Sequence, residues 1–483
     1  MSNPDVIVVG GGVSGLSVAW WLAQAGIAVE VWEQDARPGG KILTREADGY
    51  LTERAASMML NFRPEVSQML ASTRLDAAKV MCPGTPQDQR YLVQDGRLVP
   101  FPLRLGELML SPLWSVRGKL RLLLEPFVPR GGHPDETVSE FIIRRLGREA
   151  LEKAMEPFIA GPLASDPDQA NAHAVLPRLV ALERRYGSLA LGAGVHQILQ
   201  RRGAPVREMF SFSGGMSSLV EALAATPGVR FRAGSTATQL EPTESGWRLV
   251  GSTPDGDYMV RARHLVLSAP APAAAALVHP LDTELARLLR GIGYAPLMVV
   301  HLAFDRSAIR QPLDGLGFLV PRLERLQLTG CQWISSLFPC RAPRGKVLLA
   351  CYVGGARAPE TMDWDDDQCI EAAVAWLGPL MGIDAAPERV WIDRHERALP
   401  LYHGAYLCRL HAIARCLGSW PGLHLAANYW GGVSVRDRIV RGFALAQRIR
   451  TALAGSRLSS SLAPAFHPCP APSVTRSSCQ ESL

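Results

Sequence analysis

The chain has 483 residues, of which 47% are hydrophobic, 51 are Lys or Arg and 45 are Asp or Glu. At roughly 100–200 residues per domain, this length predicts about two to four domains, and the composition excludes disorder over most of the chain. The 9 Cys form no CxxC pair, which argues against a zinc ribbon or a disulfide framework and favours a reducing compartment. No stretch reaches the ~18 uninterrupted apolar residues of a membrane-spanning helix, and we expect no secretory signal, so the expected location is cytoplasmic.

Nearly all of the basic residues are Arg, because Lys occurs only at positions 41, 79, 119, 153 and 346. Arg binds carboxylates and phosphates in a bidentate manner, which favours an acidic small molecule or a membrane surface as partner. The basic residues are spread among acidic ones without an aromatic RNA-binding signature, so we expect no nucleic-acid partner.

The first forty residues predict a strand, a glycine-rich turn, a helix and a second strand that ends at an acid. The turn and its surroundings contain Gly10, Gly12, Val13, Ser14, Gly15 and, after the second strand, Glu33. The first glycine permits the tight turn, the second lets the backbone approach a pyrophosphate, and the third lets the helix pack closely on the strand. The helix N-terminus attracts phosphate, and the acid accepts hydrogen bonds from ribose hydroxyls. The sequence therefore predicts a dinucleotide site.

A second glycine pair with basic neighbours follows at Arg37, Gly39, Gly40 and Lys41. Its backbone amides can wrap around the same pyrophosphate. Here the sequence resembles the large group of FAD-dependent oxidases that includes amine oxidases, carotenoid desaturases and protoporphyrinogen oxidases. The resemblance implies that the dinucleotide is FAD, and we expect it to be bound non-covalently. We also expect Gln34 and Ala237 to contact it.

Further along the chain, helices are predicted over 136–160, 177–200 and 366–380, and short strands over 90–93, 97–100, 229–268, 294–304, 316–320 and 346–354. The predicted class is α/β: a split Rossmann-type FAD-binding domain with an inserted helical domain and a mixed-sheet substrate-binding domain. The expected divisions are FAD-binding parts at 1–63, 209–293 and 401–454, a helical domain at 64–208, a substrate domain at 294–400 and a disordered tail at 455–483.

The segment 423–435 predicts a strand, a Gly-Gly turn and a second helix N-terminus. Such a helix start can stabilise the negative charge that develops on a reduced flavin, although an ordinary strand-to-helix turn looks the same. The FAD oxidase group closes its domain with a similar segment. The resemblance assigns Asn428, Val433, Ser434 and Val435 to the cofactor, while Ala427 replaces a glycine that is common there.

Several segments between these two elements resemble one branch of the group, the oxygen-dependent porphyrinogen oxidases of the protoporphyrinogen or coproporphyrinogen type. The matching segments keep the family order and are 137–147, 156–167, 186–189, 210–216, 313–321 and 354–357. Departures occur at 53–56 and at Ser165, which stands in place of a glycine. The sequence leaves open which of the two porphyrinogens is the substrate.

The resemblance implies oxidation of a porphyrinogen to the porphyrin by FAD and molecular oxygen in haem biosynthesis, with hydrogen peroxide as product. The flavin carries this chemistry, so we expect no catalytic side chain, and the 11 His show no metal-ligand spacing. By family position, Arg90 binds a propionate, Leu316 and Leu319 sandwich the ring, and Gly161 lines the cavity. Each of these four residues also has an ordinary interpretation, as a surface Arg, core leucines and a turn glycine.

Residues 97–130 combine Trp and long apolar residues with an excess of basic ones, which suits an interfacial helix as well as a buried helical subdomain. Peripheral contact with the inner face of the cell membrane, and a homodimer, therefore stay open. Another FAD oxidoreductase of the same fold, acting on an amine or a carotenoid, also stays open as an alternative. Tyr429 and Trp430 fit the aromatic cage of an amine oxidase. An escort protein that keeps the fold without redox use is disfavoured, because all pyrophosphate glycines are present.

Overall fold

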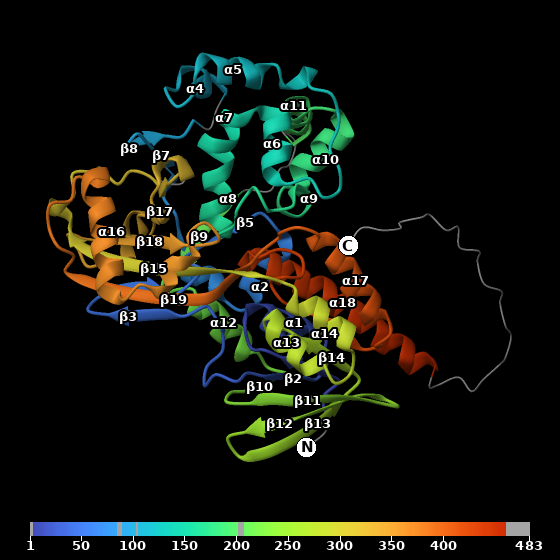
Figure 1. Cartoon of the computed structure of the whole chain (residues 1–483). Helices are drawn as coiled ribbons and strands as arrows, with labels where there is room; N and C mark the ends of the chain where they lie inside the picture. Colours follow the sequence, from blue (N-terminus) through green and yellow to red (C-terminus); the bar gives the residue numbers. More distant parts are fainter. Residues whose placement is uncertain (1–2, 85–88, 103–104, 201–206, 460–483) are drawn as a thin grey trace.

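The computed structural model describes residues 3–84, 89–102, 105–200 and 207–459. It confirms the predicted α/β class: a parallel sheet, a mixed sheet and a helical region occupy different parts of the molecule (Figure 1). The first residues of the predicted tail, 455–459, belong to the long helix α18 (Val435–Ser459). The remainder of that tail lies outside the described residues.

A five-stranded parallel sheet is assembled from three distant parts of the chain. In spatial order its strands are β10 (Val229–Arg232), β2 (Val29–Trp32), β1 (Val6–Val9), β14 (His264–Leu267) and β20 (Leu423–Leu425). The β1 and β2 strands are buried on both faces, as a parallel sheet covered by helices requires. The predicted splitting of the nucleotide-binding domain is therefore confirmed.

Helices cover both faces of this sheet. On one face lie α1 (Val13–Gln24), α2 (Pro64–Ser72), α12 (Ser217–Ala224) and α18. On the other lie α13 (Ala271–Val278), α14 (Thr283–Arg290), α17 (Tyr406–Gly418) and the antiparallel strands β11 (Thr236–Thr243), β12 (Gly246–Thr253) and β13 (Gly256–Ala262). The α1 and α18 helices approach closely, because a Cβ at Gly442 would lie 2.9 Å from Cβ of Ser17.

The mixed sheet has seven strands. In spatial order they are β19 (Arg389–Pro400), β15 (Tyr294–Asp305), β18 (Lys346–Gly354), β17 (Leu328–Gln332), β16 (Gly317–Leu319), β7 (Tyr91–Gln94) and β8 (Arg97–Pro100). Helix α16 (Asp366–Met381) covers one face. The β7–β8 hairpin falls within the range 64–208, yet it pairs with β16 of this sheet.

Small β-structures connect the large parts. Strands β3 (Thr44–Ala47) and β4 (Tyr50–Glu53) form a hairpin, and β5 (Met59–Asn61), β9 (Glu208–Phe212) and β6 (Lys79–Met81) form a three-stranded sheet.

The helical region holds α4 (Leu105–Leu110), α5 (Val116–Leu123), α6 (Val138–Leu146), α7 (Arg148–Ala150), α8 (Glu156–Leu163), α9 (Ala172–Val175), α10 (Pro177–Tyr186) and α11 (Leu189–Gln200). The predictions of single helices over 136–160 and 177–200 are wrong, because each is divided at a glycine. Gly147 has φ +93° and Gly187 has φ +76°, values that end a right-handed helix. Within the described ranges, no helix is long and apolar enough to cross a membrane.

Candidate active site

The turn between β1 and α1 has the geometry that close approach to a phosphate requires. Gly10 has φ +110°, which L side chains rarely adopt. A Cβ at Gly15 would lie 2.1 Å from the carbonyl oxygen of Gly10 and 3.0 Å from Oγ of Ser268 on the neighbouring strand end. The third glycine therefore lets α1 start directly on the turn, with its N-terminus and the exposed edge at Gly12 available to an anion.

The second glycine pair lies against this turn. The N–H of Gly39 donates to the carbonyl of Gly11 over 2.8 Å, and a Cβ at Gly40 would lie 3.5 Å from Cα of Gly12. Gly39 and Gly40 both have positive φ, +112° and +58°. The structure thus brings the two predicted glycine motifs together into one main-chain cradle, as expected for a pyrophosphate site.

The basic residues of this second loop point elsewhere. The guanidinium of Arg37 donates to the carbonyls of Gly40 at 2.9 Å and Ile42 at 3.0 Å, so it shapes the loop. The ammonium of Lys41 donates to Ala398 O at 2.6 Å and to Arg397 O, both in β19. Burial lowers the pKa of Lys41 to about 8. Lys41 therefore connects the cofactor loop to the mixed sheet through carbonyl groups.

Glu33 lies at the carboxyl end of β2, where the ribose is expected. Its Oε2 accepts from the N–H of Gly11 at 2.7 Å and its Oε1 from the N–H of Asp35 at 2.9 Å. Burial raises the pKa of this carboxyl above its usual value, and the two N–H donors oppose that shift. Gln34 is exposed beside it, and Ala237 on β11 packs on the apolar cluster around Trp32.

The turn from β20 to α18 forms the third part of the site. Gly431 and Gly432 have φ +91° and +108°, and Oγ of Ser434 caps α18 by accepting from the N–H of Asp437 at 3.1 Å. Ala427 is absent from the described residues with positive φ, so replacement of the common glycine costs this turn nothing. The half-buried Asn428, Val433, Ser434 and Val435 all lie on this turn and first helical residues.

Arg438, one turn into α18, is a residue that the sequence analysis missed. It is 2% exposed, and its Nη1 donates to the carbonyls of Ala427 and Trp430. The hydroxyl of Tyr406 donates to the carbonyl between them, that of Tyr429. Among the described residues, Nε and Nη2 of Arg438 have no hydrogen-bond partner, and burial lowers the pKa of this guanidinium to about 10.

These contacts satisfy three buried carbonyls of the turn and so fix its conformation. A cation at a helix N-terminus opposes the helix dipole. An Arg in the first turn of a helix is therefore unfavourable by itself, and this position in the sequence could have indicated that Arg438 binds carbonyls of the preceding turn.

The structure connects the four predicted substrate residues in two pairs. A Cβ at Gly161 in α8 would lie 2.6 Å from Cδ2 of Leu319, so these two residues are in direct contact. Leu316 donates its N–H to the carbonyl of Gln89 at 2.9 Å, which places it beside Arg90 at the start of β7. Arg90, Leu316 and Leu319 are half-buried. They lie where the mixed sheet meets the helical region.

Glu53, the acid that the divergent segment 53–56 keeps from the family pattern, and Ser165 have local roles. Glu53 is 2% exposed and accepts from the N–H of Met216 and the hydroxyl of Thr44, both at 2.8 Å, and its carboxylate lies 3.2 Å from the buried Arg341. Burial raises the pKa of Glu53 to about 7. Ser165 has an ordinary φ and its hydroxyl lies 3.0 Å from Nε2 of His403, while the neighbouring Ala164 takes the left-handed conformation.

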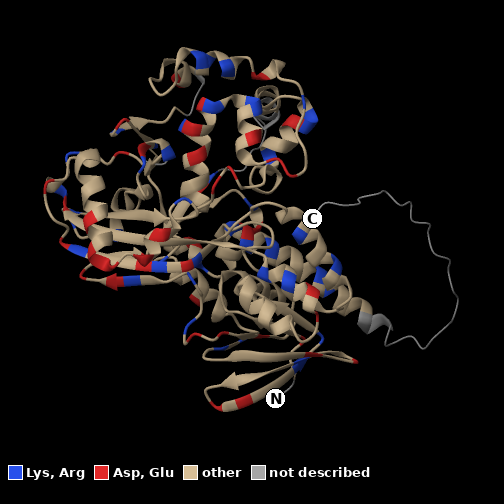
Figure 2. Ribbon diagram, in the orientation of Figure 1, with Lys and Arg blue, Asp and Glu red and all other residues tan. Residues whose placement is uncertain are grey.

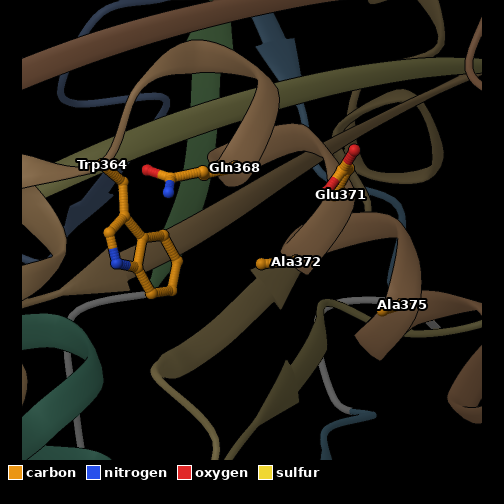
Figure 3. A pocket seen from close by; sticks show the side chains of 5 residues that line it. All are labelled: Trp364, Gln368, Glu371, Ala372 and Ala375. Carbon is orange, nitrogen blue, oxygen red and sulfur yellow. The ribbon is translucent and has the colours of Figure 1, made fainter.

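A surface hollow of about 410 Å³ lies on the outer side of α16 (Figure 3). Trp364, Gln368, Glu371 and two alanines line it. It contains a carboxylate and no cation, so it does not suit a phosphate or a carboxylate ligand, and it belongs to the face of the mixed sheet away from the glycine cradle.

Comparison with known proteins agrees with this site. The family model described as flavin containing amine oxidoreductase matches residues 13–450. The chain belongs to this family. It is 31% identical to the chloroplastic protoporphyrinogen oxidase of Oryza sativa subsp. japonica over 474 residues, which covers 91% of this chain and 87% of that protein. It is 26% identical to coproporphyrinogen III oxidase of Bacillus subtilis (strain 168), with coverage of 90% and 96%.

A crystal structure described as a candidate protoporphyrinogen oxidase from Exiguobacterium sp. 255-15 superposes with a TM-score of 0.77 at 23% identity, covering 94% of this chain and all of that chain. The predictions of the family, the fold, an oxidoreductase and FAD as cofactor are confirmed. The geometry fits FAD: the glycine cradle, Glu33 and the α18 turn lie along the carboxyl edge of one parallel sheet. The roles of individual residues toward FAD and substrate stay predictions.

Proposed function

We propose that the chain oxidises a porphyrinogen to the porphyrin in haem biosynthesis, with molecular oxygen as electron acceptor. The observation that carries the proposal is the contact of Gly161 in α8 with Leu319 of the mixed sheet, together with the main-chain bond that holds Leu316 next to Arg90. A guanidinium next to apolar walls suits a large flat ring with carboxylate substituents. Proteins named as protoporphyrinogen and coproporphyrinogen III oxidases match this chain over most of their length, which supports the same substrate class.

FAD held by the glycine cradle, Glu33 and the α18 turn would supply two-electron redox chemistry: in each step the ring would lose a hydride from a meso carbon and a proton from a nitrogen, and oxygen would take up two electrons and two protons as hydrogen peroxide. The protein binds the ring, orients it and excludes water from the site. Arg90 pairs with a propionate, while Leu316 and Leu319 remove the ring from water. Gly161 leaves room that any side chain would fill, because its Cβ would meet Leu319. Arg438 and Ser434 hold the α18 turn so that its N–H groups face the cofactor.

Anaerobic mixing with protoporphyrinogen IX and with coproporphyrinogen III tests the proposal. The yellow flavin absorbance should bleach with at least one of them, and admission of oxygen should restore it with formation of the porphyrin and peroxide. Free FAD at the same concentration controls for direct chemical reduction. Absence of bleaching with both substrates would contradict the proposal.

An amine oxidase is the rival within the family, and the structure offers it little. Tyr429 is 0% exposed and packs in the core of the parallel sheet, so its ring cannot face an amine. Peroxide formation with putrescine or benzylamine, without porphyrinogen turnover, would favour this rival.

We further propose that the helical region contacts an anionic lipid surface. Its outer side carries large apolar side chains in and around α4, α5 and α11, at the end of the molecule remote from the parallel sheet (Figure 1). They are Leu110, Val116, Leu120, Leu123, Leu124, Phe127 and Leu191. Leu110 is 88% and Phe127 is 81% exposed, which is costly in water without a partner. Basic residues of α5 lie among them (Figure 2), as at membrane interfaces.

Flotation with vesicles rich in anionic phospholipid tests this contact. The intact protein should float, and the double variant V116S/F127S should stay at the bottom. Leu323→Ser is the matched control, because Leu323 is 58% exposed but lies in the mixed-sheet domain. Failure of the unchanged protein to float would contradict the proposal, and a concentration-dependent dimer that the double variant abolishes would assign the face to a second copy of the chain.

A further inference from the structure

Three polar side chains meet where the cofactor domain touches the mixed sheet. The hydroxyl of Ser57 donates to Oε1 of Gln332 over 2.9 Å, and the hydroxyl of Tyr352 donates to the same oxygen over 2.9 Å. Ser57 follows β4, Gln332 ends β17, and Tyr352 lies on β18. We call these three residues the amide triad.

The amide triad lies on the same face of the sheet as the proposed ring site. A Cβ at Gly330 would lie 3.0 Å from Cδ2 of Leu319, so Gly330 and Leu319 share a face. Gln332 follows Gly330 by two residues along β17 and therefore has the same orientation. Tyr352 pairs with Gly330 across β17 and β18 and also lies on this face.

The opposite face belongs to the core under α16. Cys331 and Cys351, the neighbours of Gln332 and Tyr352 in sequence, are buried there. The polar side chains of the triad therefore face the helical region and the cofactor domain instead of α16. The end of β17 at Gln332 is held in place, because the next residue, Trp333, donates its N–H to the carbonyl of Leu316 at 3.1 Å.

The hydrogen bonds decide which end of the amide is presented. Both lone-pair directions of Oε1 are occupied, one by the Ser57 hydroxyl and one by the Tyr352 hydroxyl. The amide oxygen is thus turned toward the sheet and the cofactor domain, and the NH₂ group of the half-buried Gln332 is directed away from them. An NH₂ group is a pure donor, and its natural partner is a carboxylate or carbonyl oxygen.

Resting on the proposed function, we infer that Gln332 is a specificity-determining residue that donates to a carboxylate on the edge of the porphyrinogen. A ring that presents a vinyl group at this point would leave the donor unpaired in a water-excluded site, and such sites discriminate strongly. The site therefore favours coproporphyrinogen III, which carries propionates where protoporphyrinogen IX carries vinyl groups.

The test compares kcat/KM for the two porphyrinogens in the FAD-loaded enzyme and in Gln332→Leu. The unchanged enzyme should prefer coproporphyrinogen III by about tenfold or more, and Gln332→Leu should remove most of that preference by lowering kcat/KM for coproporphyrinogen III alone. Gln239→Leu is the matched control, because Gln239 is an exposed glutamine on β11 whose side chain donates to Glu241, away from the mixed sheet.

A second variant and a second readout keep the test decisive if Gln332→Leu folds poorly. Tyr352→Phe keeps the packing of the ring but frees one lone pair of the amide oxygen, so it should lower the preference partly. Binding of the product porphyrins, followed by quenching of protein fluorescence, should show the same order without turnover: coproporphyrin tighter than protoporphyrin, and the difference reduced in both variants.

The outcomes separate this inference from the proposed function. Oxidation of neither porphyrinogen contradicts the proposed function itself. Oxidation of both with equal kcat/KM, a preference for protoporphyrinogen IX, or a preference that Gln332→Leu leaves unchanged would overturn the role of Gln332 while the proposed function stands.

Discussion

Replacement of Gly15 by Ala should release FAD, since this position is the tightest contact in the glycine cradle. The added Cβ would lie 2.1 Å from the carbonyl oxygen of Gly10, about 0.9 Å inside the 3.0 Å limit that real Cβ atoms respect. Val8 Cγ1 at 2.9 Å and Ser268 Oγ at 3.0 Å close the other directions. Backbone forms the nearest contact, so no side-chain rotation relieves the overlap, and α1 must move away from the turn.

Overpacking of this kind costs about 1–3 kcal/mol. Part of that cost falls on the protein without cofactor, and part falls on FAD binding, because the N–H groups of the displaced turn no longer fit the pyrophosphate. At about 1.4 kcal/mol per factor of ten, half of this cost corresponds to a fall in FAD affinity of about two- to tenfold. The melting temperature without FAD should fall as well.

Reconstitution of the apoprotein with FAD, followed by flavin fluorescence, measures the dissociation constant directly. Gly418→Ala is the matched control, because a Cβ at Gly418 meets nothing within 4 Å. If Gly15→Ala binds FAD as tightly as Gly418→Ala does, the cradle does not hold the pyrophosphate in the way proposed.

Four further predictions follow from buried or site groups. Arg438→Met should weaken FAD binding about tenfold and lower the flavin midpoint potential, because the turn carbonyls lose their donors, whereas Arg450→Met on the exposed side of α18 should change neither. Arg90→Ala should raise KM for the porphyrinogen more than it lowers kcat, as steady-state kinetics would show. Burial lowers the pKa of His301 from 6.5 to about 4, so the stability that its neutral form provides is present above pH 6.5 and is lost as the pH falls toward 4. In urea titrations, the unfolding free energy of His301→Leu should therefore fall by about 3 kcal/mol less over that pH interval than that of the unchanged protein. Glu125→Met should cost about 3 kcal/mol, because the fully buried Arg145 loses its nearer carboxylate and keeps only Glu183 at 3.5 Å, and the double variant E125M/R145M should recover part of that loss.

Local signals in the sequence were sufficient for the parts of the site that are local in the chain. The β1–α1–β2 unit, the second glycine pair and the turn before α18 each depend on glycines and helix starts within a few residues, and each has the expected geometry. The helical pattern in the sequence begins after the glycine motif, at Leu16, whereas α1 begins three residues earlier, inside the motif at Val13.

The features that escaped prediction depend on pairing between distant residues. The β7–β8 hairpin joins the mixed sheet through β16, more than 200 residues away, and no periodicity within 91–100 encodes that partner. The helical segments divide at Gly147 and Gly187, which both have positive φ. Arg121 packs against Gly147 and Arg130 packs against Gly187. Likewise, the orientation of the Gln332 amide is set by the hydroxyls of Ser57 and Tyr352, which lie on other elements.

The excess of Arg over Lys in the composition has a structural explanation that the net charge of the chain does not show. Arg357, 8% exposed at its side chain, pairs with Glu156 of α8 and donates to the carbonyls of Val320, Leu326 and Leu328. Arg145 also donates to the main-chain carbonyls of Val128 and Gly187, and Arg438 donates to that of Trp430. A guanidinium has five donors in a fixed plane, so one buried Arg satisfies several backbone acceptors at a junction between elements, where an ammonium has three donors on a flexible stem.

Arg357 joins the helical region to the mixed sheet and Arg438 holds the turn that follows β20, whereas Arg145 acts inside the helical region. Acidic and basic side chains are accordingly mixed over most of the molecule (Figure 2). Positive charge therefore acts locally here: inside the protein it fixes loops near the proposed site, and on α5 it accompanies an exposed apolar face. A long-range field that would attract a polyanion does not arise from such an arrangement.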